Sequence, residues 1–394
     1  MVNRPEAGKP LTVMMSCGEA SGELYAAALA RAIHELAPGT RIVALGGADL
    51  KAAGVEILAD YHGISVTGLS EALRVVPRSL ALIRELGKAA DRIRPDVFVP
   101  LDFPDFNFGL MRAMAKRGVP IVYYISPQLW AWRKGRMRTM KRLVKKVLVI
   151  FPFEEAIYRE AGVDAEFVGH PLVDLAAASA DRDTLRARFG AGPSTPLVAL
   201  LPGSRANELR AILPDMARAA ALVAARMPAA RFVLARAPRL ADDLFAPLAG
   251  AMPGIEVAMA ESAADDVLAA SDVVITASGT ATVQTALHER PMVIVYRVSP
   301  VTSFIGRMFV KLDTFGMVNL IAGERIVPEL VQERFTPQAV ADEVVSLLTD
   351  SARREAMIGR LRDVKQRLGG QGGARRAAEA ILRAVRPPGA TLTS

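Results

Sequence analysis

Two short loops rich in glycine and hydroxyl side chains have the composition of phosphate-binding turns. LPGSR (201–205) and ASGTAT (277–282) each follow an apolar, strand-like run and precede a helix-like stretch. Glycine lets the backbone approach a ligand, and the first turn of a helix presents N–H groups with a partial positive charge. An ordinary capped turn explains either loop alone, but the pair favours a diphosphate site. Its candidate residues are Gly203, Ser204, Arg205, Ser278, Gly279, Thr280 and Ala281.

Two carboxylates in the run DFPDFN (102–107) are candidates for a general base. Asp102 ends a strand-like run beside Phe and Pro, an apolar environment in which carboxylates become better proton acceptors. Such a base could activate a hydroxyl group of a bound substrate. Asp102 is the first choice, although helix capping explains it about as well. Asp105 is the second choice, because it is equally well placed to cap the next helix.

The glycine-rich run CGEASGE (17–23) follows the first strand-like run. It lacks the G-x-G-x-x-G spacing, so we do not expect NAD binding. Its glycines permit close backbone approach, and a tight turn with a capping serine is the simpler explanation. The candidates of this run for binding an acceptor, meaning the substrate whose hydroxyl the base would activate, are Gly18, Glu19, Ser21 and Gly22.

Nothing in the sequence has the spacing of a metal site. The pair Asp181 and Asp183 precedes a helix-like stretch and fits helix capping better than chelation. We therefore predict a diphosphate site without a metal or other cofactor, in which helix N-termini and Arg205 neutralise the bound diphosphate. No two of the four histidines stand at ligand spacing: His34, His62, His170 and His288.

Both tryptophans lie in SPQLWAWRKGR (126–136), at the start of a run of arginines and lysines. Aromatic rings beside cations suit a membrane interface, so we expect Trp130, Trp132, Arg133 and Lys134 to face a membrane. The same residues would suit stacking on single-stranded nucleic acid, and a solvated basic helix with buried indoles explains the charges too. The net charge of +8 requires an anionic partner without deciding which.

Strand-like and helix-like stretches alternate along the chain, which is typical of right-handed β-α-β units and parallel sheets. We predict an α/β fold of two Rossmann-like halves, with ligands bound beyond the carboxyl ends of the strands. The strand-like runs of the first half are 11–17, 41–47, 96–102, 120–126 and 146–152, and those of the second are 196–203, 231–236, 254–259, 272–278 and 291–297.

Three features favour a cytoplasmic protein that, if it binds a membrane, does so only at the membrane surface. The single cysteine, Cys17, fits a reducing compartment. No stretch reaches the roughly 18 apolar residues of a membrane-spanning helix. The first ten residues lack the apolar core of a signal peptide.

Seven motifs, taken in order, resemble the lipid-A-disaccharide synthase family. Each motif alone is weak, but the ordered set is highly specific. The motifs are GEASGE (18–23), LDFPDFN (101–107), YISPQLWAWRKGR (124–136), FVGHPLVD (167–174), LLPGSRANE (200–208), ASGTAT (277–282) and NLIAGERIVPELVQE (319–333).

The resemblance implies a GT-B fold, with two Rossmann-like domains facing a cleft. Residues 1–173 would form the acceptor- and membrane-facing domain and 174–365 the UDP-sugar-binding domain, while 366–394 would pack back on the N-terminal domain. The implied substrates are UDP-2,3-diacylglucosamine and 2,3-diacylglucosamine 1-phosphate. The implied partners are the anionic inner-membrane surface and a second subunit that exchanges C-terminal segments in a homodimer, with no nucleic acid.

The resemblance also implies roles for single residues. Asp102 matches the family's base candidate, Arg205 its diphosphate arginine, and Asn319 an active-site position. Gln284 stands where many members have a glutamate that binds the donor ribose, and Glu23 stands where aspartate is usual. A neutral amide should bind a ribose hydroxyl more weakly than a carboxylate does.

Two other classes of function remain open on the residues alone. Another GT-B enzyme, such as a lipid-linked N-acetylglucosaminyltransferase or a UDP-sugar 2-epimerase, would need the same diphosphate loops. A nucleotide- or nucleic-acid-binding module without catalytic activity would also use the basic surface.

Overall fold

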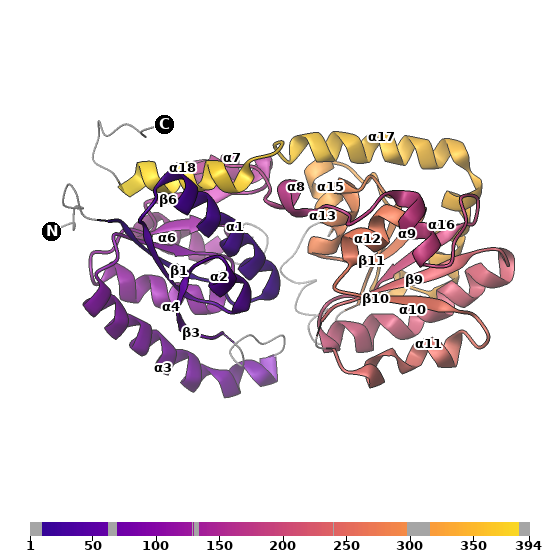
Figure 1. Ribbon diagram of the computed structural model, residues 1–394, viewed down its shortest axis with the longest axis horizontal. Helices are drawn as coiled ribbons and strands as arrows, with labels where there is room; N and C mark the ends of the chain where they lie inside the picture. The colour runs from indigo at the N-terminus through magenta and orange to yellow at the C-terminus, as the bar shows by residue number, and fades with distance from the viewer. Residues whose placement is uncertain are drawn as a thin grey trace. The chain divides into compact units, whose positions relative to one another are not determined.

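The computed structural model describes residues 10–61, 69–127, 129, 134–238, 240–297 and 316–385. The chain divides into two compact units (Figure 1). Unit 1 comprises Met1–Pro171 together with Leu368–Ser394, and unit 2 comprises Leu172–Arg367. The final segment of the chain therefore belongs to the same unit as the first.

Unit 1 contains seven described strands, all parallel to their neighbours. One sheet has the order β3-β2-β1-β4 and another the order β5-β6-β7. Parallel bridges from Phe98 to Ile121 and from Leu101 to Tyr124 join β4 to β5. The strands are β1 (Thr12–Ser16), β2 (Arg41–Leu45), β3 (Glu56–Ala59), β4 (Val97–Pro100), β5 (Val122–Tyr124), β6 (Lys146–Val149) and β7 (Ala165–Phe167).

The helices of unit 1 cover these strands, and the last helix of the chain packs against the first, as Figure 1 shows for α18 and α1. Arg376 of α18 donates to the carbonyl oxygens of Val168 and Gly369, each over 2.8 Å. The described helices are α1 (Ala20–Leu36), α2 (Ala48–Ala52), α3 (Leu69–Ile93), α4 (Pro104–Ala115), α6 (Lys134–Leu143), α7 (Pro152–Glu160) and α18 (Gly373–Val385).

Unit 2 contains one parallel sheet of six strands in the order β10-β9-β8-β11-β12-β13. Continuous apolar runs form its central strands because both faces are covered by helices. The strands are β8 (Leu197–Leu201), β9 (Arg231–Arg236), β10 (Val257–Glu261), β11 (Val273–Ala277), β12 (Met292–Tyr296) and β13 (Glu329–Val331).

The helices of unit 2 alternate with these strands. Asp181 caps α9, since its side chain accepts from the Thr184 N–H over 3.0 Å, so the predicted capping role is confirmed. The helices are α8 (Leu172–Leu175), α9 (Arg182–Arg188), α10 (Ala206–Arg226), η1 (Asp242–Phe245), α11 (Ala246–Ala251), α12 (Ala264–Ala270), α13 (Thr280–Leu287), α15 (Met317–Ala322), η2 (Gln332–Arg334), α16 (Pro337–Thr349) and α17 (Ser351–Arg367).

The predicted fold class is confirmed. Both units have the doubly wound strand order, which reverses between β1 and β4 in unit 1 and between β8 and β11 in unit 2. At such a reversal the loops from adjacent strands diverge and leave room for a ligand. Within the described part of the chain, no helix is both long enough and apolar enough to cross a membrane.

A buried histidine makes the stability of unit 1 depend on pH. His170 is 2% exposed, and its ring packs against those of Tyr25 and Phe151. Burial lowers the pKa of His170 to about 3, whereas an unfolded histidine titrates near about 6.5. The unfolded state therefore binds more protons between these values, so stability is complete above about pH 6.5 and falls as the pH falls.

We expect unit 1 to lose about 2 kcal/mol of unfolding free energy through His170 between pH 7 and pH 5. Urea unfolding followed by the fluorescence of Trp130 and Trp132, both in the unit 1 sequence, measures this loss. His170→Gln should show a smaller decrease over the same range. An equal pH dependence in both proteins would show that other groups dominate.

Candidate active site

The two predicted phosphate loops lie side by side in unit 2. β8 and β11 are hydrogen-bonded neighbours, with Leu200 opposite Ile275 and Leu201 opposite Thr276. LPGSR (201–205) begins in the last residue of β8, and ASGTAT (277–282) begins in the last residue of β11. Both loops therefore leave the sheet where its strand order reverses, and each leads into a helix.

In the first loop, the backbone and Arg205 already bind a carboxylate of the chain itself. Glu208 accepts from the Ser204 N–H over 3.0 Å and from Arg205 Nη1 over 3.1 Å. Gly203 has a φ of +117°, and a Cβ there would lie 2.5 Å from Glu208 Oε2, so glycine is required. The N-terminus of α10 thus has the geometry and charge to hold an anionic oxygen.

The second loop also has a glycine with a positive φ, here at the start of its helix. Gly279 has a φ of +139° and precedes α13, whose first N–H groups have no partner within the helix. Thr282 Oγ1 donates to the Gly279 carbonyl over 2.8 Å, which fixes the turn. Thr280 is exposed at the helix N-terminus. A second set of anion-binding groups therefore stands beside the first.

Gln284 lies one turn further along α13 and is held by an aspartate. Its Nε2 donates to Asp265 Oδ1 over 2.8 Å, and His288 Nε2 lies 2.8 Å from the same oxygen. The Gln284 side chain is therefore oriented from within unit 2.

In unit 1, the candidate acceptor and base residues meet where β1 and β4 end. A Cβ on Gly18 would lie 2.2 Å from the ring of Phe103, so only glycine lets the two loops approach this closely. Glu19 is the N-cap residue of α1, and Ser21 and Gly22 lie in its first turn. The glycine run predicted that another group would lie close to the backbone at Gly18. In the structure that group is the side chain of Phe103 from the other loop.

Asp102 occupies a strained backbone turn. Asp102 and Phe103 have φ values of 42° and 47°, in the left-handed region that residues with a Cβ rarely adopt. The Asp102 carbonyl accepts from Asn107 Nδ2 and from Tyr123 Oη, each over 2.7 Å. Ser16 Oγ in turn donates to Asn107 Oδ1 over 2.8 Å. Three fully buried polar side chains thus hold this turn in place.

The surroundings distinguish Asp102 from Asp105. Burial, and after it the charge of the Asp102 carboxylate, raises the pKa of the Tyr25 hydroxyl on α1. Asp105 is exposed in the first turn of α4 and forms an ion pair with Arg136 over 2.6 Å. The ion pair with Arg136 stabilises the charged form of the Asp105 carboxylate, which makes it a weaker proton acceptor. Asp102 is therefore the better candidate for a base.

Asn319 is buried, with only 1% of its surface exposed. Both polar atoms of its side-chain amide form hydrogen bonds within unit 2. Nδ2 donates to the Val327 carbonyl and to Glu329 Oε1, and Oδ1 accepts from the N–H groups of Ile326 and Val327. Asn319 therefore orders the segment before β13, and a direct ligand contact would require some of these bonds to break.

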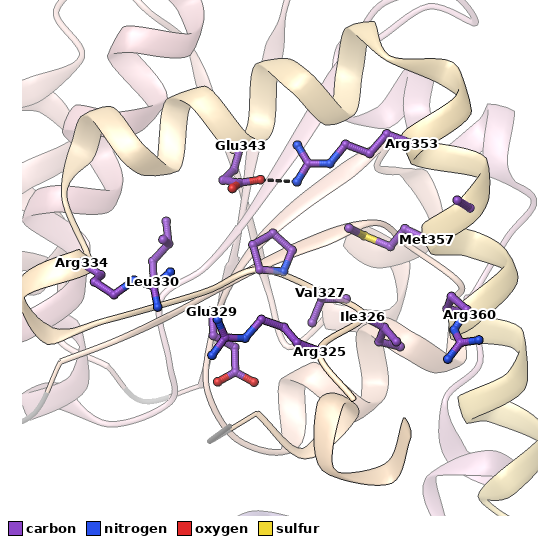
Figure 2. Close-up of a pocket in the computed structure, with 12 residues that line it drawn as sticks. Arg325, Ile326, Val327, Glu329, Leu330, Arg334, Glu343, Arg353, Met357 and Arg360 are labelled. Atoms are coloured by element: carbon purple, nitrogen blue, oxygen red, sulfur yellow. Dashed lines mark hydrogen bonds and ion pairs between the residues drawn. The ribbon is translucent and has the colours of Figure 1, made fainter. Parts of the chain in front are cut away.

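Beside this segment lies a pocket of about 430 Å³ (Figure 2). Two of its arginines are paired, Arg353 with Glu343 and Arg360 with Glu324. None of its lining residues belongs to LPGSR or ASGTAT, and Arg325 to Pro328 precede β13 at the amino end of the strand. The pocket is therefore separate from the proposed donor loops.

The membrane-facing prediction lies largely outside the described residues, since these exclude Trp130, Trp132 and Arg133, and α6 begins at Lys134. Among the described residues, no three His, Cys, Asp or Glu side chains gather as a metal site.

The sequence interpretation missed five residues that support the candidate site: Ser16, Asn107, Tyr123, Glu208 and Asp265. One signal was available for Asn107, because an asparagine among Phe106, Phe108 and Leu110 on a helix requires internal hydrogen-bond partners. The others could not be assigned, since their partners are distant in sequence or are also explained by helix capping.

A family model described as lipid-A-disaccharide synthetase matches residues 13–385. The lipid-A-disaccharide synthase of Myxococcus xanthus (strain DK1622) is 42% identical over 96% of this chain and 99% of that protein. The synthase of Koribacter versatilis (strain Ellin345) is 44% identical over 94% and 98%.

Solved structures show likeness of fold alone. A putative UDP-N-acetylglucosamine 2-epimerase from Listeria monocytogenes has a TM-score of 0.64 at 13% identity, covering 96% of each chain. The glycotransferase of kitacinnamycin has a TM-score of 0.64 at 18% identity, covering 95% of this chain and 99% of that one. Since epimerases and glycosyltransferases share this fold, the family match decides between them, and the chain belongs to the lipid-A-disaccharide synthase family.

Proposed function

We propose that this chain is an inverting glycosyltransferase of lipid A biosynthesis. It transfers 2,3-diacylglucosamine from UDP to 2,3-diacylglucosamine 1-phosphate, which yields the β-1,6-linked lipid A disaccharide 1-phosphate and UDP. The observation that carries this proposal is the family match over residues 13–385. The fold alone would not support it, because it is shared with epimerases.

The donor diphosphate binds to unit 2. The Ser204 N–H, the Arg205 guanidinium and the N-termini of α10 and α13 provide positive charge at adjacent strand ends. When the bond from the sugar C1 to the diphosphate breaks, UDP leaves with the electron pair. These groups then stabilise the charge that develops on the leaving oxygen.

The acceptor hydroxyl is activated by Asp102 of unit 1. Its carboxylate takes the proton of the acceptor 6-hydroxyl as that oxygen forms a bond to C1 on the face opposite the diphosphate, which inverts the configuration. The buried bonds from Asn107 and Tyr123 to the Asp102 carbonyl hold the backbone and so limit the directions of the carboxylate.

The acyl chains of both substrates require access to a membrane. We propose peripheral binding to the cytoplasmic face of the inner membrane. Val76 and Leu80, one turn apart on α3, each expose 48% of their surface, and the exposed Arg84 follows one turn further on the same face. Such a mixture of apolar and cationic side chains suits an anionic lipid surface. A homodimer with exchanged C-terminal segments remains part of the proposal.

Turnover of both acylated substrates in mixed micelles, with and without added divalent metal, tests this function. We expect release of UDP together with a disaccharide 1-phosphate, at a rate that chelation of metal does not change. Conversion of UDP-N-acetylglucosamine to its 2-epimer without an acceptor would favour the epimerase instead. Steep salt-dependent binding to single-stranded nucleic acid without UDP release would favour a binding module.

A further inference from the structure

The side chain of Gln284 is held by a carboxylate that no catalytic step above requires. Asp265 Oδ1 accepts from Gln284 Nε2 over 2.8 Å and shares a second contact of 2.8 Å with His288 Nε2. The side chains of Asp265 and His288 are only 24% and 11% exposed. Partial burial strengthens both hydrogen bonds relative to bonds in water.

The carboxylate determines which way the Gln284 amide points. A carboxylate accepts hydrogen bonds and does not donate them, so Nε2 must face Asp265 and Oε1 must face away. Within the described residues, no group donates a hydrogen bond to this Oε1. Gln284 also follows Thr280 by four residues, so the two share one face of α13. Oε1 is therefore a fixed acceptor one turn from the proposed diphosphate site.

We propose that Asp265 is a positioning residue for the donor nucleotide: by holding Nε2 of Gln284, it presents Oε1 to a ribose hydroxyl. The inference rests on the proposed function, since it requires a nucleotide on the ASGTAT loop. A nucleoside linked to a phosphate at the α13 N-terminus lies within reach of the face that carries Gln284.

The same contact explains why an amide stands at this position. A glutamate in place of Gln284 would bring two carboxylates within hydrogen-bond distance, and like charges this close do not both remain ionised without a large cost. The glutamine removes the repulsion and leaves one acceptor oxygen for the ligand. Asp265 and Gln284 therefore form a matched pair, in which the identity of one residue constrains the other.

The inference is tested by exchanging the amide of Gln284 and the carboxylate of Asp265 and measuring the affinity for UDP by titration calorimetry. Gln284→Glu alone should weaken UDP binding at least about tenfold, because the introduced carboxylate and that of Asp265 repel each other. Adding Asp265→Asn should restore affinity to within about threefold, since the new amide donates to the introduced carboxylate while its oxygen accepts from His288. Asp265→Ala should weaken UDP binding as much as Gln284→Ala does.

Gln338→Glu is the matched control. Gln338 Nε2 donates to Asp342 Oδ1 over 2.9 Å on the exposed face of α16, so the same charge change occurs away from both loops. We expect unchanged UDP affinity for this control. In turnover, Asp265→Ala should raise the KM for the donor and leave kcat nearly unchanged, which a general loss of stability would not do.

Equal UDP affinity of Gln284→Glu with and without Asp265→Asn would overturn the inference, as would Asp265→Ala with wild-type affinity. If Gln284→Ala binds UDP normally while Arg205→Ala does not, the donor site stands and the positioning role is wrong. Failure of the wild-type protein to bind UDP would instead remove the proposed function itself, and the inference with it.

Discussion

Replacing Asp102 by asparagine is expected to slow disaccharide formation about a hundred- to ten-thousandfold, the range for loss of a general base. The substitution keeps the size of the side chain and leaves the backbone bonds from Asn107 and Tyr123 to the Asp102 carbonyl in place. Binding of UDP should not change, because the donor loops belong to unit 2. Turnover in mixed micelles together with UDP calorimetry separates these two effects.

Asp105→Asn is the control variant for the Asp102→Asn prediction. Asp105 lies three residues away, is exposed and pairs with Arg136, so its loss should change turnover by less than about threefold, as expected for a surface ion pair. If Asp105→Asn abolishes transfer and Asp102→Asn does not, the base is Asp105. If neither variant is impaired, no carboxylate of this loop removes the proton.

The fold could be predicted from the sequence because its signals are local and repeated. Apolar runs such as PLVALLPG and DVVITAS recur with helix-length spacers, and only parallel sheets accommodate that alternation. The positions of LPGSR and ASGTAT at neighbouring strand ends follow from the same logic, although adjacency of β8 and β11 requires the strand order, which is not local. Resemblance to the family was also readable, because the seven motifs occur in order.

The support for Asp102 could not be predicted in this way. Its left-handed turn depends on Asn107, Tyr123 and Ser16, which come from a helix and two strands far apart in the chain. Backbone conformations that cost energy are maintained only by such surrounding structure. A single sequence without the fold shows the carboxylate but not the bonds that fix it.

Asn319 and Gln284 illustrate a different limit. Both residue types could contact a ligand, and their motif positions suggested it, but sequence does not show how much of an amide is already used inside the protein. All of the Asn319 amide is engaged, whereas Gln284 retains one oxygen. The count of remaining acceptors follows only from the packed structure.

Arg205→Ala is expected to weaken UDP binding about ten- to a hundredfold, the loss of one or two charge-assisted hydrogen bonds. Arg205 is the N-cap residue of α10 and keeps its guanidinium at the loop through Glu208. A diphosphate carries more charge than the Glu208 carboxylate, and it would compete for Arg205 and for the Ser204 N–H. Arg205→Lys should recover part of the affinity, since it restores charge without the planar fork.

The matched control for this loss is Arg210→Ala, which removes an exposed arginine from the same helix about one turn beyond the loop. Both variants lower the net charge by one, so a purely long-range effect of charge would weaken UDP binding equally in both. We expect calorimetry to show normal affinity for Arg210→Ala. Equal losses would mean that Arg205 acts only through the overall field, and normal affinity in both would mean that the diphosphate binds elsewhere.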